Sequence, residues 1–125
     1  MARHNDTGKW GEELAVKLLH DKGYTIIERD WRSGHRDIDI IARTPDSRTM
    51  VFVEVKTRTS DIITRPEDAV DVKKIRNIGY AADNYVKMHN TVDELRFDII
   101  SIVGENAKVA KVEHIADAFN PLLVF

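Results

Sequence analysis

An apolar stretch of this sequence carries two opposite charges near its end. The segment VFVEVKTR, residues 51–58, is rich in valine and phenylalanine, which favours a buried strand. Glu54 and Lys56 lie in its second half, and burying a charge without a partner is costly. Side chains alternate along a strand, so the two groups point to the same face, about 7 Å apart. Such a strand needs either a structural partner for these charges or a function that uses them.

A second acidic strand comes before it. In the sequence DIDIIAR, residues 37–43, Asp37 and Asp39 share one face. The short turn that follows predicts a hairpin, which brings Asp39 level with the region of Glu54. Converging carboxylates repel each other unless a cation neutralises them, and oxygen ligands favour Mg²⁺ or Mn²⁺ over zinc. A metal held there, with Lys56 beside it, would suit the hydrolysis of a phosphodiester.

The same spacing has a simpler explanation. An acid and a lysine two residues apart are common on strands, and Glu54 and Lys56 can form an ordinary ion pair at the sheet margin. On spacing alone, that ion pair is the more frequent case. A structural ion-pair network therefore stays open beside the metal site.

Apolar periodicity predicts the elements that would position these residues. The expected order is helix, three strands, helix and two strands, over residues 10–22, 24–31, 37–43, 49–57, 67–89, 95–103 and 108–115. Residues 58–66 are expected to be irregular, with Pro66 opening the second helix. The predicted fold class is α/β, a mixed sheet flanked by two helices, in a single domain over residues 1–125.

Composition narrows the class of protein. The formal net charge is −2, so binding to nucleic acid would need a local basic patch. The absence of cysteine excludes disulfides, thiolate zinc sites and a cysteine nucleophile. The five histidines lack metal-ligand spacing and are expected at the surface. No apolar stretch has membrane-spanning length and the start of the chain is too polar for a secretory signal, so we expect a cytoplasmic protein that does not bind membranes.

Several segments together resemble a known family. They are GKWGEELA (8–15), GY (23–24), DIDIIA (37–42), VFVEVKTR (51–58), PEDAV (66–70), Lys74 and RFD (96–98). Asp39 followed by Glu54-Val55-Lys56 is similar to the PD-(D/E)xK nuclease signature. Over most of its length the chain resembles the YraN-like family of predicted endonucleases, which is related to archaeal Holliday-junction resolvases.

This resemblance implies a restriction-endonuclease-like core and Mg²⁺-dependent cleavage of DNA, with Mn²⁺ as an alternative metal. In such sites Asp39 and Glu54 would bind the metal, helped by the backbone carbonyl of Val55. Lys56 would position or activate the attacking water. The substrate implied is DNA, with branched or otherwise structured DNA as one option.

An acid on the first helix is a further implied ligand. Related resolvases use such an acid, and the matching position here is Glu12. The helical wheel supports it independently, because Glu12 falls about 20° from Leu19, on the flank of the apolar stripe. The family usually has Gly-Glu before its Ile-Asp, whereas this chain has Arg36-Asp37, so Asp37 has no assigned role.

Three basic residues are candidates for binding the nucleic-acid backbone. Arg32, Arg58 and Lys74 could rim the acidic site and bind phosphates without reading sequence. Lys73, on the outer side of the predicted helix, is expected to be solvated. A homodimer is plausible because a four-way junction has two-fold symmetry, and the apolar tail, residues 121–125, would either pack back on the domain or form an interface. The alternatives are a nucleic-acid-binding module without catalysis and an interaction protein with a structural ion-pair network.

Overall fold

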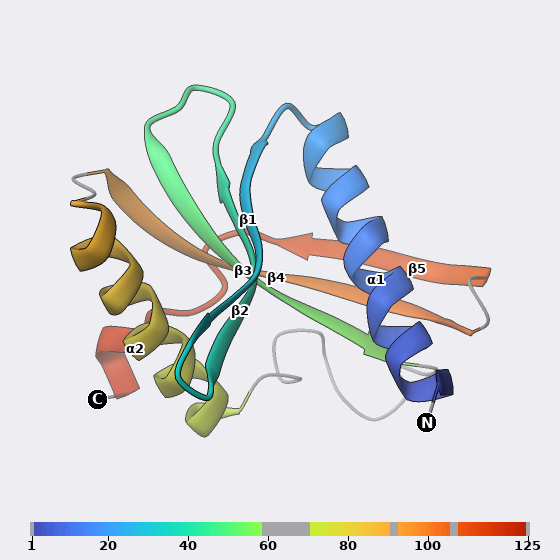
Figure 1. Ribbon diagram of the computed structural model, residues 1–125. Coiled ribbons are helices and arrows are strands. Elements are labelled where there is room, and N and C mark those ends of the chain that lie inside the picture. Colours follow the sequence, from blue (N-terminus) through green and yellow to red (C-terminus); the bar gives the residue numbers. More distant parts are fainter. Residues whose placement is uncertain (1, 59–70, 91–92, 106–107, 125) are drawn as a thin grey trace.

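Two helices pack around a five-stranded sheet in the computed structural model, which describes residues 2–58, 71–90, 93–105 and 108–124 (Figure 1). The elements are α1 (Ala2–Asp21), β1 (Thr25–Ser33), β2 (Arg36–Arg43), β3 (Thr49–Arg58), α2 (Val72–His89), β4 (Glu94–Glu105), β5 (Lys108–Ile115) and the 3-10 helix η2 (Pro121–Val124). The predicted order of helices and strands is confirmed, and so is the α/β fold class. This architecture is consistent with a restriction-endonuclease-like core.

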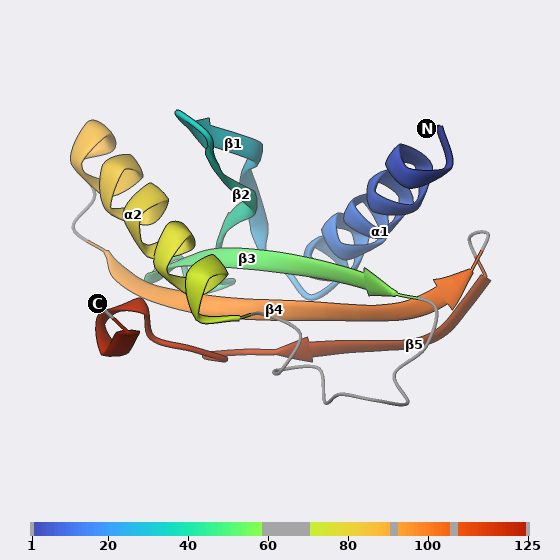
Figure 2. The same cartoon turned by 90° about the horizontal axis from the view of Figure 1, so that it is seen from below.

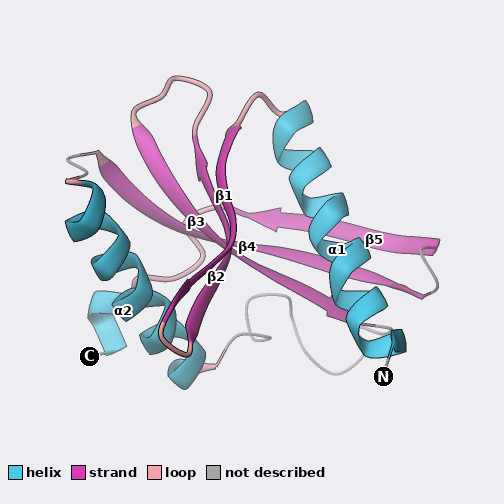
Figure 3. Ribbon diagram, in the orientation of Figure 1, coloured by secondary structure: helices cyan, strands magenta, loops and turns pink. Residues whose placement is uncertain are grey.

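The strands lie in the order β1-β2-β3-β4-β5. The pairs β1–β2, β2–β3 and β4–β5 are antiparallel, and only β3 and β4 run parallel. Parallel neighbours need a crossover connection, and α2 lies within the one that joins these two strands. Figure 3 shows the strands lying between the two helices, with α1 on one side and α2 on the other.

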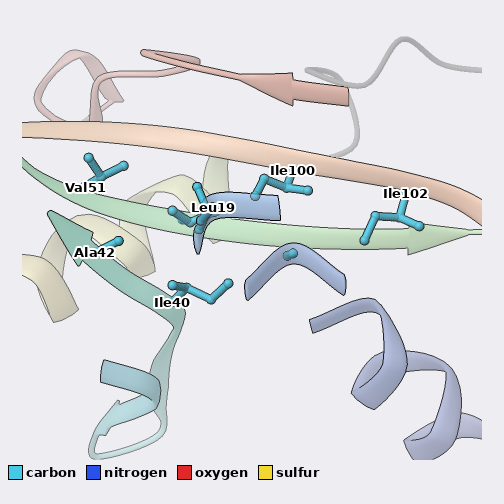
Figure 4. Packing of buried hydrophobic residues seen from close by; sticks show 8 residues of the cluster. Leu19, Ile40, Ala42, Val51, Ile100 and Ile102 are labelled. Carbon is cyan, nitrogen blue, oxygen red and sulfur yellow. The ribbon is translucent and has the colours of Figure 1, made fainter. Parts of the chain in front are cut away.

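One face of the sheet packs against α1. Residues of alternate positions on the central strands meet Ala15 and Leu19 of this helix in one buried cluster: Ile40, Ala42, Val51, Val53, Ile100 and Ile102 (Figure 4). Leu19 is fully buried, and such burial stabilises the fold by about 1.5–3 kcal/mol. This packing fixes α1, and with it Glu12, relative to the strands.

The opposite face packs against α2. Met50 and Phe52 alternate with the residues that face α1, and they lie in a second cluster with Tyr85 of α2 and Ile41 of β2. The rings of Phe52 and Tyr85 meet edge to face with centroids 6.2 Å apart. Glu54 follows Phe52 by two residues and therefore points to the α2 face as well.

The hairpin of β1 and β2 separates from the rest of the sheet. Its own pairing continues to Ser33 and Arg36, whereas the β2–β3 pairing ends at Ile40 and Val53. Figure 2 shows this hairpin rising from β3 between the two helices. Gly34 turns it with a φ of 64°, a left-handed conformation that glycine adopts without strain. The turn is therefore shorter than the loop expected over residues 32–36.

Several predicted boundaries of helices and strands were wrong. Helix α1 begins at Ala2 rather than at residue 10, because helical hydrogen bonding continues past the end of the apolar stripe. Helix α2 begins at Val72 rather than at residue 67, because the carboxylate of Asp71 accepts a hydrogen bond from the Lys74 amide and caps it. Strand β4 runs from Glu94 to Glu105, longer than predicted. Of the segment 58–66 that was expected to be irregular, Arg58 belongs to β3. Residues 59–66, and with them the role of Pro66, lie outside the described residues.

The tail packs partly back on the domain. Its 3-10 helix η2 lies against α2, with Pro121 buried and the side chain of Leu122 exposed. None of the helices within the described residues combines the length and the apolar character needed to cross a membrane.

Candidate functional site

An acidic site lies where β2 leaves β3. Asp39 and Glu54 are each one residue beyond Ile40 and Val53, the last β2–β3 pair. There the backbone amide of Val55 donates to Oδ2 of Asp39 over 2.8 Å, so a carboxylate takes the place of a strand partner. The separation of the strands therefore leaves the Val55 amide to Asp39 and orients that carboxylate.

Glu54 is the most buried acid of this site. Only 8% of the residue is exposed, and its Oε1 is buried without a hydrogen-bond partner in the part of the chain that the structure describes. Burial, and then the charge of Asp39, raise the pKa of Glu54 to about 8, although Lys74 acts in the opposite direction. The folded protein therefore holds a proton at this carboxyl more readily than an exposed glutamate would.

Asp39 responds to the same surroundings. Burial raises the pKa of Asp39, against the lowering effects of the Val55 amide and of Lys74. Each acid acts on the pKa of the other, so Asp39 and Glu54 titrate as a pair. Two such groups in one desolvated place favour either a shared proton or a bound cation.

Lys74 reaches this pair from the first turn of α2. Its Nζ lies 3.8 Å from Oε2 of Glu54 and 3.8 Å from Oδ1 of Asp37. Burial lowers the pKa of Lys74, but the carboxylates of Glu54, Asp37 and Asp39 outweigh burial and raise it. The cation that contacts the acids therefore comes from α2, and Asp37 belongs to the same group.

Glu12 lies close enough to Asp39 for that charge to act on its pKa, but its ion pair is with Arg29. Its pKa is raised by burial and then by the charge of Asp39, while Arg29 lowers it. The two side chains of Glu12 and Arg29 form an ion pair at 3.5 Å. Gly11 permits this position, because a Cβ there would lie 2.1 Å from Oγ1 of Thr57 on β3. Sequence reasoning assigned Gly11 no role beyond its place in the family-like segment 8–15, although a glycine inside a helix signals a close approach.

The donor set fits a hard divalent cation. Asp39 and Glu54 offer carboxylate oxygens, including the unpartnered Oε1 of Glu54. Mg²⁺ is usually held by one or two carboxylates and keeps several waters, so it does not need a closed protein cage. Across residues 2–58, 71–90, 93–105 and 108–124, no group of three or more His, Cys, Asp or Glu side chains is arranged to hold a metal ion. The fit thus rests on two acids.

A family model described as "Uncharacterised protein family UPF0102" matches residues 11–102 of the chain. The chain belongs to the UPF0102 family. This confirms the predicted membership of the YraN-like family. A UPF0102 protein of Bacteroides thetaiotaomicron is 45% identical over 123 residues, which cover 98% of this chain and 99% of that protein. A UPF0102 protein of Porphyromonas gingivalis is 46% identical over 125 residues, covering 99% of this chain and 90% of the relative.

One solved structure, of Pyrococcus furiosus SfsA in complex with Ca²⁺, is a distant match to this UPF0102 chain. It has 14% sequence identity and a TM-score of 0.33, over 90% of this chain and 63% of that chain. A likeness at this level does not establish a common fold.

The remaining predicted site residues of this UPF0102 protein lie around the acids. Lys56 is exposed on β3, on the same face as Glu54, and forms no ion pair with a described carboxylate. Val55 is half-buried, and its side chain packs against the cluster facing α1. Arg32 is largely exposed and pairs with Asp30 at 3.6 Å. Arg58, half-buried, ends β3. The structure thus brings Lys74 into contact with the acids, and leaves Lys56 and Arg32 outside that contact.

A second charged network of the UPF0102 chain lies on the other face of the sheet. Asp98 is fully buried and pairs with Arg96 at 2.8 Å and with His114 at 2.7 Å. Burial would raise the pKa of Asp98, but hydrogen bonds from His114, from Arg96 and from the Asp117 amide outweigh burial and lower it. Asp98 lies beside Val53, so it points towards α1 and away from Glu54. The expectation that all histidines are superficial was wrong, since only 4% of the His114 side chain is exposed.

Proposed function

We propose that this protein is a metal-dependent endonuclease of the PD-(D/E)xK type that hydrolyses phosphodiester bonds in DNA. The observation that supports it is the buried carboxyl of Glu54, which lies against Asp39 and keeps one oxygen without a hydrogen-bond partner among the described residues. A structural role would favour satisfying that oxygen, because an unsatisfied buried acceptor costs about 1–3 kcal/mol. A cation bound at the site would satisfy it.

Each residue has a role in this proposal. Asp39 and Glu54 hold Mg²⁺ or Mn²⁺, with the Val55 carbonyl as a further ligand and Glu12 as an accessory acid. The bound metal would supply positive charge at the scissile phosphate and lower the pKa of the attacking water. Lys56, exposed on the face of Glu54, orients the water and the phosphate.

The surrounding basic residues suit a phosphate backbone. Arg32 is exposed on the hairpin, and Arg58 lies at the end of β3, four residues beyond Glu54. Both would contact phosphates without reading sequence, so binding should weaken steeply as salt rises. Branched DNA would suit a symmetric dimer, which light scattering with and without a four-way junction would detect.

The test is cleavage of labelled single-stranded, duplex, flapped and four-way-junction DNA, with Mg²⁺, Mn²⁺ or chelator. Asp39→Asn and Lys56→Met are the informative variants, because asparagine keeps an acceptor for the Val55 amide and methionine keeps the length of the lysine. Lys73→Met, on the exposed side of α2, is the matched control. Metal-dependent cutting that both informative variants lose would support the proposal, whereas cutting that survives in Asp39→Asn would refute it.

A second candidate is a nucleic-acid-binding module without catalysis. It is favoured by the ion pairs of Lys74, which already supply a positive charge to Asp37 and Glu54. This candidate predicts binding that depends on Arg58 but not on Asp39, and no cutting of any substrate. Gel-shift titrations of Arg58→Met and Asp39→Asn beside the cleavage assay separate the two functions.

A further inference from the structure

Lys74 occupies an unusual place for a residue expected to bind DNA. Its ammonium group lies 3.8 Å from the nearest oxygens of both Asp37 and Glu54. These distances are ion-pair distances, longer than the roughly 2.7–3.2 Å of a direct hydrogen bond. The amine thus sits between two carboxylates, at an ion-pair distance from each.

A divalent cation at Glu54 would come close to this amine. Such an ion lies about 2.0–2.2 Å from a carboxylate oxygen when it is Mg²⁺. Since Nζ of Lys74 lies 3.8 Å from Oε2 of Glu54, the two positive charges would be only a few ångströms apart. Only 9% of the Glu54 side chain is exposed, so little water is available to screen their repulsion.

We propose that Lys74 is the resident counter-ion of the acidic site, and that a divalent cation binds by displacing its ammonium group from Glu54 onto Asp37. The inference rests on the proposed function, because it requires that Asp39 and Glu54 bind a metal. It gives Asp37, which had no assigned role, a defined one as the acceptor of the displaced amine.

The two ends of the ion pair differ in a way that suits this exchange. The side chain of Asp37 is 35% exposed and that of Lys74 is 36% exposed, whereas Glu54 lies beneath them. Asp71 caps α2 through the amide of Lys74, which fixes the backbone while the four-carbon side chain can still turn. The amine can therefore leave Glu54 without losing Asp37 and without moving the helix.

The test measures Mn²⁺ binding by calorimetry at one pH and salt, without DNA. Lys74→Met removes the charge and keeps much of the length, and Lys73→Met, on the exposed side of the same turn, is the matched control. We expect Lys74→Met to bind Mn²⁺ at least tenfold more tightly than the wild type, or about 1.4 kcal/mol. The affinity of Lys73→Met for Mn²⁺ should stay within about twofold of the wild type, because its charge lies away from the site. Asp39→Asn should abolish binding, because it removes a negative charge that attracts the ion. Lys74→Gln repeats the test should Lys74→Met not fold.

The possible outcomes separate the two proposals. Tighter binding in Lys74→Met alone supports the exchange, and so does Mn²⁺ binding that appears only in that variant. The exchange is overturned if the wild type binds Mn²⁺ through Asp39 and Lys74→Met binds it equally well or more weakly. The proposed metal site then still stands. No Mn²⁺ binding by the wild type or by either Lys74 variant overturns both.

Discussion

Replacing the buried carboxyl of Glu54 with an amide should make the metal-free protein more stable than the wild type, by an amount that grows as the pH rises. Glu54→Gln keeps the shape of the side chain and removes its titration. In the folded state the pKa of Glu54 is raised from 4.5 to about 8, by burial and by Asp39. The folded state therefore binds this proton more tightly than the unfolded state, and the wild type loses stability as the pH rises from 4.5 to 8.

The size of this loss follows from the two pKa values. At about 1.4 kcal/mol per pKa unit, the shift from 4.5 to about 8 corresponds to about 5 kcal/mol once Glu54 is fully ionised. By the linkage relation, the wild type has lost less than about 1 kcal/mol of its free energy of unfolding at pH 5 and about 3 kcal/mol at pH 7. The variant is free of this penalty, so its advantage over the wild type should grow across that range.

Urea unfolding in chelator, at pH 5, 7 and 9, measures the effect on the wild type and on Glu54→Gln. The matched control is Glu94→Gln, which changes an exposed acid at the start of β4 and should leave the pH profile unchanged. A constant difference between Glu54→Gln and the wild type from pH 5 to 9 would refute the reasoning. It would mean that Glu54 is neither desolvated nor close to a second carboxylate.

Two further substitutions test the frame around the site. Asp98→Asn should destabilise the protein by about 3–5 kcal/mol in urea unfolding, because it leaves Arg96 and His114 without their buried carboxylate; a loss under about 1 kcal/mol would contradict this pairing. Gly11→Ala should cost about 1–3 kcal/mol despite alanine's higher helix propensity, because its Cβ would lie 2.1 Å from Oγ1 of Thr57. Adding Thr57→Ala should recover part of that loss, and a gain in stability from Gly11→Ala alone would contradict the close approach.

Much of the acid pair could be predicted because it depends on local rules. Alternation places Asp39 and Glu54 on defined faces of their strands, and the short turn before Thr49 limits the possible registers of the hairpin. The element order followed from periodicity for the same reason. These features depend on neighbours in the sequence and hardly on how distant elements dock.

The contacts of Lys74 and His114 could not be predicted in this way. A helical wheel places Lys74 on the flank of α2, but which carboxylates it meets depends on how α2 packs against Phe52. The burial of His114 depends on the pairing of β5 with β4, which sets this residue opposite Ile100. Nothing in the sequence around His114 indicates that it is buried. The ion pairs of Lys74 and the burial of His114 both result from tertiary packing.

Because β2 separates from β3, the distance between the carboxyl groups of Asp39 and Glu54 depends on the position of the β1–β2 hairpin. Asp39 belongs to the hairpin and Glu54 to the central sheet, so any tilt of the one against the other changes the gap between the two carboxyl groups. The tip of the hairpin is attached to α2, where Asn84 donates to Ser33 over 2.9 Å. Substitutions at that attachment can therefore change the distance between the two carboxyl groups without altering either acid.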